Sequence, residues 1–419
     1  MQPYARHRQH RSYRTTPLRI LIVNDYRGFV GGVETYLERL LPALRKRGHR
    51  IAFLYRTEVS AGSCAVDADG GFDAVWHAPE FNSPMLEELS AWDPDIVYVN
   101  EPPSLKWHSA LLDRFSVAMF AHCYYGACVS GKKMHALPHP VACDRRCGPA
   151  CLALYYPRRC GGLSPLTLIQ SYRTERARQT LLQQHRAILV ASEHMRADYI
   201  RQDVSADRIH VVPLPQTAVP LDSAPPAPRI ANGRLLFLGR LTDLKGADYL
   251  LRALVPAQRA LGKTLRLTIA GTGPEESRIR ALAARLHLNV DFKGWLDREA
   301  CVRELQQTDL LAVPSLWPEP FGLVGIEAGA LGIPSVAYAT GGIMEWLHPG
   351  ISGEIAESDP PTPEGLARAI VRALSDPGHY QDLCRGAWEA SRRFTMKAHL
   401  DALLPIFERA SQQRGCIAQ

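Results

Sequence analysis

Short apolar runs alternate with amphipathic segments along most of this chain of 419 residues. Runs of this kind are typical of strands buried on both faces of a parallel sheet, and the amphipathic segments between them predict covering helices. In the segment Val33–Lys46, for example, leucines recur at helical spacing and form one apolar face. In the first half of the chain the pattern predicts strands at Leu18–Val23, Ile51–Leu54, Ile96–Asn100, Val117–His122, Ala187–Ala191 and Ile209–Val212.

The alternation stops at residues 216–233, which are rich in proline and predict an interdomain linker. Beyond it, strands are predicted at Leu235–Leu238, Leu265–Ala270, Val290–Phe292, Leu310–Val313 and Ser335–Tyr338. Helices are predicted between them at Ala247–Leu261, Glu275–Leu286, Arg298–Gln307 and Gly322–Ala330. From Pro363 to Ser411 the pattern is helical, with no further strand.

These patterns predict an α/β protein of two Rossmann-like domains that face each other across a cleft. The expected domains are residues 18–215 and 234–385. Residues 1–17 are expected to be a disordered basic tail, and residues 386–411 a helical tail that packs back on the first domain. Folds of this class bind ligands at the carboxyl ends of their strands. Functional side chains are therefore expected in the segments that follow strands.

The segment Pro318–Ala328 follows one predicted strand and opens a helix at about Gly322. A helix N-terminus presents free N–H groups and the positive end of the dipole, which suits a phosphate or diphosphate. Glu319 precedes the helix and Glu327 lies about one and a half turns inside it, so both can reach a ligand over the helix start. Carboxylates bind sugar hydroxyls well, although either acid taken alone is more often an ordinary solvated side chain.

A second candidate segment, Gly239–Gly246, follows the first predicted strand of the second half and contains two cations. Arg240 can bind phosphate oxygens bidentately, and Lys245 adds a point charge. The tight turn Ala270–Pro274 follows the next strand.

In order and spacing, these motifs resemble the retaining glycosyltransferases of family 4, also described as glycosyl transferases group 1, whose architecture is called GT-B. The resemblance covers about residues 18–375. The chain departs from the family at the domain boundary, where Pro213-Leu214-Pro215 replaces a turn of the Pro-Asn-Gly kind. The matching elements are Gly31-Gly32-Val33-Glu34, Gly239-Arg240 with Lys245-Gly246, Gly271-Thr272-Gly273-Pro274, Pro314-Ser315, Glu319 with Glu327, and Gly341-Gly342-Ile343-Met344-Glu345.

The resemblance implies transfer of a hexose from a nucleotide-diphosphate sugar to a glycan or glycolipid acceptor, with retention of anomeric configuration. It also implies that catalysis uses no metal and no other cofactor, and that the product belongs to a bacterial surface polysaccharide. The alternatives are a non-catalytic sugar-nucleotide sensor or scaffold, and a sugar-nucleotide epimerase or phosphorylase on the same fold. The motif residues of the donor site favour a transferase over a sensor.

The resemblance also assigns roles to individual residues. Arg240 and Lys245 would hold the donor diphosphate, while Glu319 would contact the hexose and Glu327 the ribose. The catalytic residues implied are Glu319, His122, Arg240 and Lys245. The residues implied to bind the donor are Gly31, Gly32, Arg240, Lys245, Phe321, Gly322, Leu323 and Glu327. His122 ends a strand and matches a position near the transferred sugar.

Cysteines are concentrated just beyond His122. Six of the ten lie within residues 123–160, at Cys123, Cys128, Cys143, Cys147, Cys151 and Cys160. Their spacing is not that of a standard zinc site. Three interpretations stay open: a structural metal or cluster, reduced buried thiols, or disulfide or redox-sensitive pairs. The insertion is expected to influence the choice of acceptor.

The charge pattern bears on partners and location. The net charge is +7, and no dense Arg/Lys block with interleaved aromatic residues predicts a nucleic-acid groove. Reversible attraction to an anionic membrane surface is instead predicted by the arginines of the N-terminal tail, Arg6, Arg8, Arg11, Arg14 and Arg19, together with Arg45-Lys46-Arg47 and Arg50 at the end of the first helix. No apolar run reaches the roughly 18 residues of a membrane span, and no signal-peptide pattern is present. We therefore expect a cytoplasmic protein that can reach the inner face of the plasma membrane.

Overall fold

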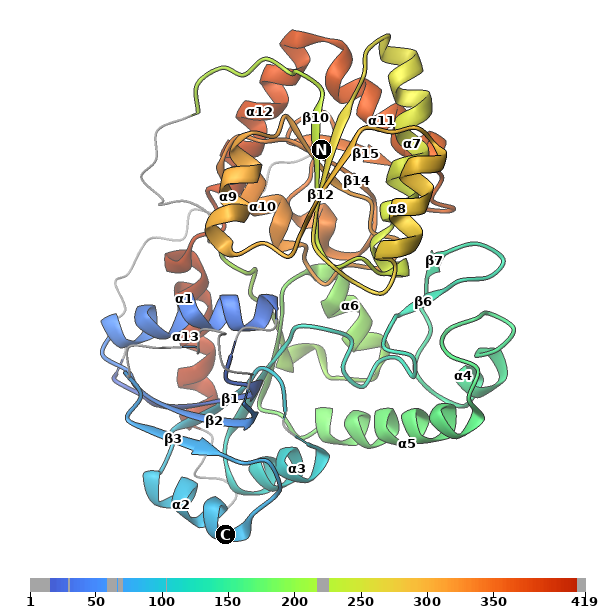
Figure 1. Cartoon of the computed structure of the whole chain (residues 1–419). Helices are drawn as coiled ribbons and strands as arrows, with labels where there is room; N and C mark the ends of the chain where they lie inside the picture. Colours follow the sequence, from blue (N-terminus) through green and yellow to red (C-terminus); the bar gives the residue numbers. More distant parts are fainter. Residues whose placement is uncertain are drawn as a thin grey trace.

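The computed structural model describes residues 16–28, 31–58, 66, 71–102, 104–216 and 226–412. It contains two parallel α/β sheets, each covered by helices on both faces, in two domains that lie one above the other (Figure 1). The predicted fold class is confirmed. The basic tail, residues 1–15, and much of the linker, residues 217–225, lie outside the described residues.

The N-domain, which we define by the first sheet and its helices, has seven parallel strands in the order β3-β2-β1-β4-β5-β8-β9. Its strands are β1 (Arg19–Tyr26), β2 (Arg50–Thr57), β3 (Ala74–His77), β4 (Ile96–Val99), β5 (Val117–Ala121), β8 (Ala187–Val190) and β9 (Ile209–Val211). Its helices are α1 (Gly32–Lys46), α2 (Ser83–Trp92), α3 (Leu105–Arg114), α5 (Pro165–Leu182), α6 (Glu193–Arg201) and the short η1 (Ala206–Arg208).

Alternate residues of the central strands pack into two different cores. Ile20 and Ile22 of β1 contact the layer formed by α1 and the C-terminal helix α13 (Met396–Gln412). Leu21 and Val23 pack on the opposite face, with α2, α3 and α6. Both faces are therefore dry, which explains why the strands are continuous apolar runs.

Helix α13 belongs to the last part of the chain but packs on the N-domain. The Tyr36 hydroxyl lies 2.8 Å from His399 Nε2, and the rings of Tyr98 and Phe407 make an edge contact with centroids 4.9 Å apart. The end of the chain thus fastens the two domains together.

The C-domain, the second sheet with its helices, has six parallel strands in the order β12-β11-β10-β13-β14-β15. Its strands are β10 (Arg234–Leu238), β11 (Arg266–Ala270), β12 (Val290–Gly294), β13 (Leu310–Val313), β14 (Ser335–Tyr338) and β15 (Gly353–Ala356). Its helices are η2 (Asp243–Lys245), α7 (Ala247–Leu261), α8 (Glu276–Arg285), α9 (Arg298–Gln306), α10 (Leu323–Ala330), η3 (Gly341–Glu345), α11 (Pro363–Ser375) and α12 (Pro377–Ser391).

Two edge strands, β3 and β15, were not among the predicted elements. Each has four residues, and β3 alternates between half-buried and exposed positions, so neither forms the apolar run that marks a central strand. The cysteine-rich insertion forms a two-stranded antiparallel hairpin, β6 (Met134–His135) with β7 (Val141–Ala142), and the short helix α4 (Pro149–Leu154).

Candidate active site

The residues predicted for the donor side meet at the carboxyl edge of the C-domain sheet. Lys245 Nζ donates to Glu319 Oε1 at 2.5 Å, although the two residues are 74 positions apart in sequence. Ser315 Oγ donates to the same oxygen at 2.5 Å. The ammonium also lies 5.4 Å from the centre of the Trp317 ring. The structure therefore brings together a cation from the loop after β10 with a hydroxyl and a buried carboxylate from the loop after β13.

The charge state of Glu319 follows from these contacts. Burial by itself raises the pKa of this carboxyl, but the charge and hydrogen bond of Lys245, with the hydrogen bond from Ser315, outweigh burial and lower the pKa. Glu319 is only 5% exposed. A buried acid is thus held ionised at neutral pH, ready to accept hydrogen bonds from hydroxyl groups.

The turn at Gly341-Gly342 holds the backbone of Glu319 in place. Gly342 N donates to Glu319 O at 2.7 Å, and Gly341 has φ +57°. A Cβ on Gly341 would lie 2.3 Å from Glu319 O, so no other residue fits there without moving the loop. This close approach gives the predicted Gly341-Gly342 motif a structural reason.

Helix α10 begins one residue later than predicted, because Gly322 adopts a left-handed conformation with φ +87° and acts as the N-cap. Phe321, predicted to bind the donor, has a side chain that is 1% exposed and packs edge-on against Phe394. Only the Phe321 backbone is therefore placed for contact with a ligand. Leu323, the first helical residue, is half-buried.

The N-termini of two helices from different domains approach each other beside this loop. A Cβ on Gly32, the first residue of α1, would lie 3.8 Å from Leu323 Cδ1 at the start of α10. At the N-cap of α1, Gly31 N donates to Glu34 Oε2 at 2.8 Å. The predicted glycine pair and the α10 N-terminus are thus brought together, and both helix dipoles favour an anion between them.

Two further predicted residues, Arg240 and Glu327, lie in the loop after β10 and within α10. Arg240 follows β10, is exposed, and forms no ion pair with the described part of the chain, so it is available to an anionic ligand. Glu327 is half-buried and lies near α9, where burial of the Cys301 thiol, together with the charge of Glu327, raises the pKa of Cys301 to about 11. Arg298 of the same helix also reaches Glu38 of α1 at 3.8 Å.

On the N-domain side, His122 directly follows β5. Its Nε2 lies 3.0 Å from Asn100 Oδ1, and its ring stacks on Phe120 with centroids 4.6 Å apart. Burial, together with the nearby His399, lowers the pKa of His122 to about 3. The ring is therefore neutral, and with Nε2–H donated to Asn100 its Nδ1 is an acceptor for a ligand hydroxyl.

Glu101, which the sequence analysis missed, lies at the same edge of the sheet. Burial, with the charges of Glu34 and Asp25, raises the pKa of Glu101 to about 7. Asp25 itself is held by Arg56 through two contacts of 2.6 and 2.7 Å, whereas Glu101 forms no hydrogen bond or ion pair with other described residues. The signal was present, because Glu101 comes two residues after the buried strand β4.

The cysteine insertion shows no metal site in the ranges that the structure describes: nowhere are three or more His, Cys, Asp or Glu side chains placed to hold an ion. The eight described cysteines are free thiols. Cys147 and Cys151 pack in a small core with Tyr155 and Leu168, and a hydrogen bond with Cys147 lowers the pKa of Cys151.

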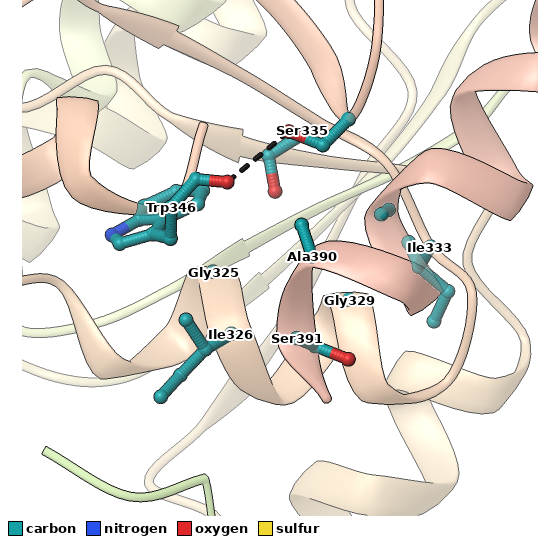
Figure 2. A pocket seen from close by; sticks show the side chains of 10 residues that line it. Gly325, Ile326, Gly329, Ile333, Ser335, Trp346, Ala390 and Ser391 are labelled. Atoms are coloured by element: carbon teal, nitrogen blue, oxygen red, sulfur yellow. Dashed lines mark hydrogen bonds between the residues drawn. The ribbon is translucent and has the colours of Figure 1, made fainter. Parts of the chain in front are cut away.

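A small cavity behind α10 is not a substrate site. It has a volume of about 10 Å³ and lies between Gly325 and Gly329 of α10, the Trp346 ring, and Ser391 of α12 (Figure 2). That volume holds about one water molecule.

None of the helices in the described ranges has the length and hydropathy needed to cross a bilayer.

The chain matches two family models, one for each domain. Residues 30–215 match the family model described as Glycosyltransferase Family 4, and residues 230–389 match the model described as Glycosyl transferases group 1. A D-inositol 3-phosphate glycosyltransferase from Xylanimonas cellulosilytica is 26% identical over 418 residues, covering 92% of this chain and 94% of that protein. A glycogen synthase from Mycobacterium tuberculosis is 32% identical over 207 residues, covering 45% of this chain and 49% of that protein.

Solved structures share the fold. Anabaena HepE in complex with UDP-glucose superposes with a TM-score of 0.65 at 18% identity, covering 96% of this chain and 100% of that chain. WaaG, a glycosyltransferase involved in lipopolysaccharide biosynthesis, gives a TM-score of 0.65 at 17% identity, covering 92% and 99%.

Proposed function

Because the chain belongs to the family 4 glycosyltransferases and has their GT-B architecture, we propose that it moves a hexose from a nucleotide-diphosphate sugar to a glycan or glycolipid acceptor, with retention of anomeric configuration. The Lys245–Glu319 pair beside the α10 N-terminus is the observation that carries this proposal. It puts a cation for a diphosphate next to an ionised carboxylate for sugar hydroxyls. Anabaena HepE, which shares the fold, was crystallised with UDP and with UDP-glucose.

In this proposal the donor lies across the carboxyl edge of the C-domain sheet. Lys245 uses one N–H on Glu319 and keeps two for phosphate oxygens, while the exposed Arg240 adds a bidentate contact. Glu319 accepts hydrogen bonds from the hexose. Glu327, farther along α10, accepts from the ribose.

The reaction separates charge. Breaking the anomeric carbon–oxygen bond leaves negative charge on the departing diphosphate and positive charge on the sugar ring. Arg240, Lys245 and the N–H groups at the start of α10 stabilise the diphosphate, so the proposal includes no catalytic metal. The ionised Glu319 stabilises the ring. His122 offers Nδ1 to a hydroxyl of the transferred sugar.

The acceptor side favours a neutral acceptor. Glu101 is half-buried, carries no compensating cation among the described residues, and lies near Glu34 and Asp25. A phosphorylated acceptor such as D-inositol 3-phosphate, named for one relative, would meet repulsion there. We therefore propose a neutral acceptor with a sugar hydroxyl as the nucleophile. In this proposal the product is a surface polysaccharide or glycolipid that is made on the cytoplasmic side of the membrane.

A donor screen tests the proposal. Purified protein is incubated with UDP-, GDP- and ADP-sugars and a mixture of neutral glycan acceptors, and release of the nucleoside diphosphate is measured. We expect turnover with one donor class and a product whose anomeric configuration, determined by NMR, equals that of the donor. An inverted product would contradict retention. Thermal stabilisation by a nucleotide sugar without any turnover would instead support the sensor, and release of a sugar 1-phosphate the phosphorylase.

A further inference from the structure

The positive charge of this chain is concentrated in one part of the N-domain. Residues 123–186, which comprise the insertion and α5, contain ten Lys and Arg but only two Asp and Glu. This surplus exceeds the net charge of +7 for the whole chain. The rest of the protein is therefore close to neutral, and the basic surface is local.

The same part of the molecule exposes apolar side chains. Among the residues that the structure describes, half of the twelve exposed large hydrophobic side chains lie between Leu137 and Ile169. Leu163 and Leu166 are 76% and 81% exposed, and Ile169 is 46% exposed. Tyr156 of the adjoining loop donates its hydroxyl to Leu163 O at 3.4 Å. We name Tyr156, Leu163, Leu166 and Ile169 the apolar tip.

The apolar tip lies at the outer edge of the N-domain, where α4 adjoins the start of α5 (Figure 1). Beneath it, Leu168 faces inward and packs in the small core with Cys147 and Tyr155. The buried side of α5 is thus satisfied within the protein, while Leu166 and Ile169, three residues apart, share its solvent side. Soluble proteins seldom leave such a group of large apolar side chains uncovered.

Four arginines lie close in sequence to the apolar tip. Arg158 and Arg159 lie between Tyr156 and Leu163, and Arg173 and Arg176 continue the exposed side of α5 beyond Ile169. None of these four guanidinium groups forms an ion pair with the residues that the structure describes, in contrast to Arg178, which pairs with Glu175 at 2.6 Å. Exposed apolar residues beside arginines that form no ion pair match the surface of an anionic bilayer, which offers both acyl chains and phosphate groups.

We propose that the apolar tip docks this protein on an anionic lipid bilayer, with Leu163 and Leu166 entering the boundary between headgroups and acyl chains and the four arginines contacting lipid phosphates. The residues of this site are other than those of the N-terminal tail, whose attraction to membranes was predicted from its charge alone.

Helix α5 connects the apolar tip to the acceptor side of the active site. Near its other end, Glu175 accepts a hydrogen bond from Gly126 N at 2.8 Å, and Arg178 lies 4.6 Å from the centre of the Tyr125 ring, in the loop that follows His122. Leu166 and Arg178 are separated by about 18 Å along the helix axis. Docking would thus hold the acceptor side near lipid headgroups, which suits a lipid-anchored acceptor; only this last step rests on the proposed function.

Flotation of the full-length protein with vesicles tests the docking without donor or acceptor. Vesicles of phosphatidylcholine alone are compared with vesicles that also contain phosphatidylglycerol. We expect binding to the anionic vesicles only, and a loss of at least about tenfold in partition coefficient for Leu163→Ser/Leu166→Ser. The matched control is Ile230→Ser/Ile351→Ser, which removes two side chains of similar exposure, 76% and 60%, outside the apolar tip. The control should bind like the wild type.

Each other outcome overturns the proposal. Wild-type protein that binds neither vesicle, or both equally, excludes an anionic docking surface. Unchanged binding of the leucine variant, with loss on Arg6→Ala/Arg8→Ala/Arg11→Ala, would assign the membrane contact to the tail. Thermal melting checks the folding of every variant, and the exposed substitutions should melt with the wild type. Because no turnover is measured, failure here leaves the proposed transferase activity standing, and the converse also holds.

Discussion

Lys245 Nζ and Glu319 Oε1 are 2.5 Å apart, and the carboxylate of this pair is almost fully buried whereas the ammonium is partly open to solvent. This asymmetry suits a site in which the acid must stay ionised while the cation faces an incoming anion. It also makes the two residues energetically unequal. Loss of the cation leaves a buried charge without its partner, which costs more than loss of both together.

Lys245→Met should therefore lower the free energy of unfolding by about 2 kcal/mol or more, and Lys245→Met/Glu319→Gln should recover part of that loss. Urea unfolding of the two single variants and the double variant measures the coupling. Lys263→Met, a lysine of the same domain with no ion pair among the described residues, is the control and should change stability little. Additive effects of the two single substitutions would mean that the pair is not coupled.

Substitutions of the two glutamates should change different kinetic parameters. The ribose assigned to Glu327 changes little during reaction, so Glu327→Ala should raise the donor KM more than it lowers kcat. The hexose assigned to Glu319 gains charge at the transition state, so Glu319→Ala should lower kcat by about 10²-fold or more. Affinity for the nucleoside diphosphate should fall only in Glu327→Ala. A folded Glu319→Ala with wild-type kcat would remove Glu319 from the catalytic centre and favour the sensor.

Acceptor use should depend on the ionisation of Glu101. With a pKa of about 7, raised by burial, Glu34 and Asp25, the carboxyl loses its charge below neutral pH and can no longer accept two hydrogen bonds. We expect kcat/KM for the acceptor to fall as the pH drops through about 7. Glu101→Gln should remove this inflection, whereas Glu80→Gln, an exposed acid of the same domain, should preserve it. An identical pH profile for Glu101→Gln would exclude this role.

Acid should destabilise the N-domain through two buried histidines. His108 Nε2 and His185 Nε2 are 2.8 Å apart, and burial lowers the pKa of His108 to about 2 and that of His185 to about 4. In the unfolded chain both histidines take up a proton near pH 6.5, whereas in the folded protein both are still neutral at that pH. The stability from neutral burial is therefore complete above pH 6.5 and is lost as the pH falls, by about 1.4 kcal/mol per pH unit for each histidine.

Urea unfolding at pH 7.5, 6.5 and 5.5 measures this loss. His185→Gln should reduce the dependence on pH. His287→Asn, at an exposed position with φ +50° that asparagine tolerates, is the matched control and should leave it unchanged. A pH dependence that is the same in all three proteins would assign the acid sensitivity to other groups.

The alternation of apolar runs and amphipathic segments by itself determined the architecture. Strands such as β1 and β4 are buried on both faces, and only an unbroken apolar run satisfies that environment. Their positions can therefore be predicted from the sequence. The edge strand β3 alternates between half-buried and exposed positions, and β15 contains Gly353 and Glu354, so neither sequence is an unbroken apolar run. The location of the site could also be predicted from the motifs that follow the strands, because the carboxyl ends of parallel strands lie at one edge of the sheet.

Tertiary structure alone decided which of these residues meet. Lys245 and Glu319 come from loops 74 positions apart, and no local pattern predicts that Glu319 accepts a hydrogen bond from Lys245. Packing turned Phe321 into the core and left Leu163 and Leu166 outside it, although all three are apolar residues in short motifs. Periodicity records how a residue sits on its own helix or strand. Burial, pKa and contact depend on what the rest of the chain brings against it, and that is settled only when the sheets and helices pack.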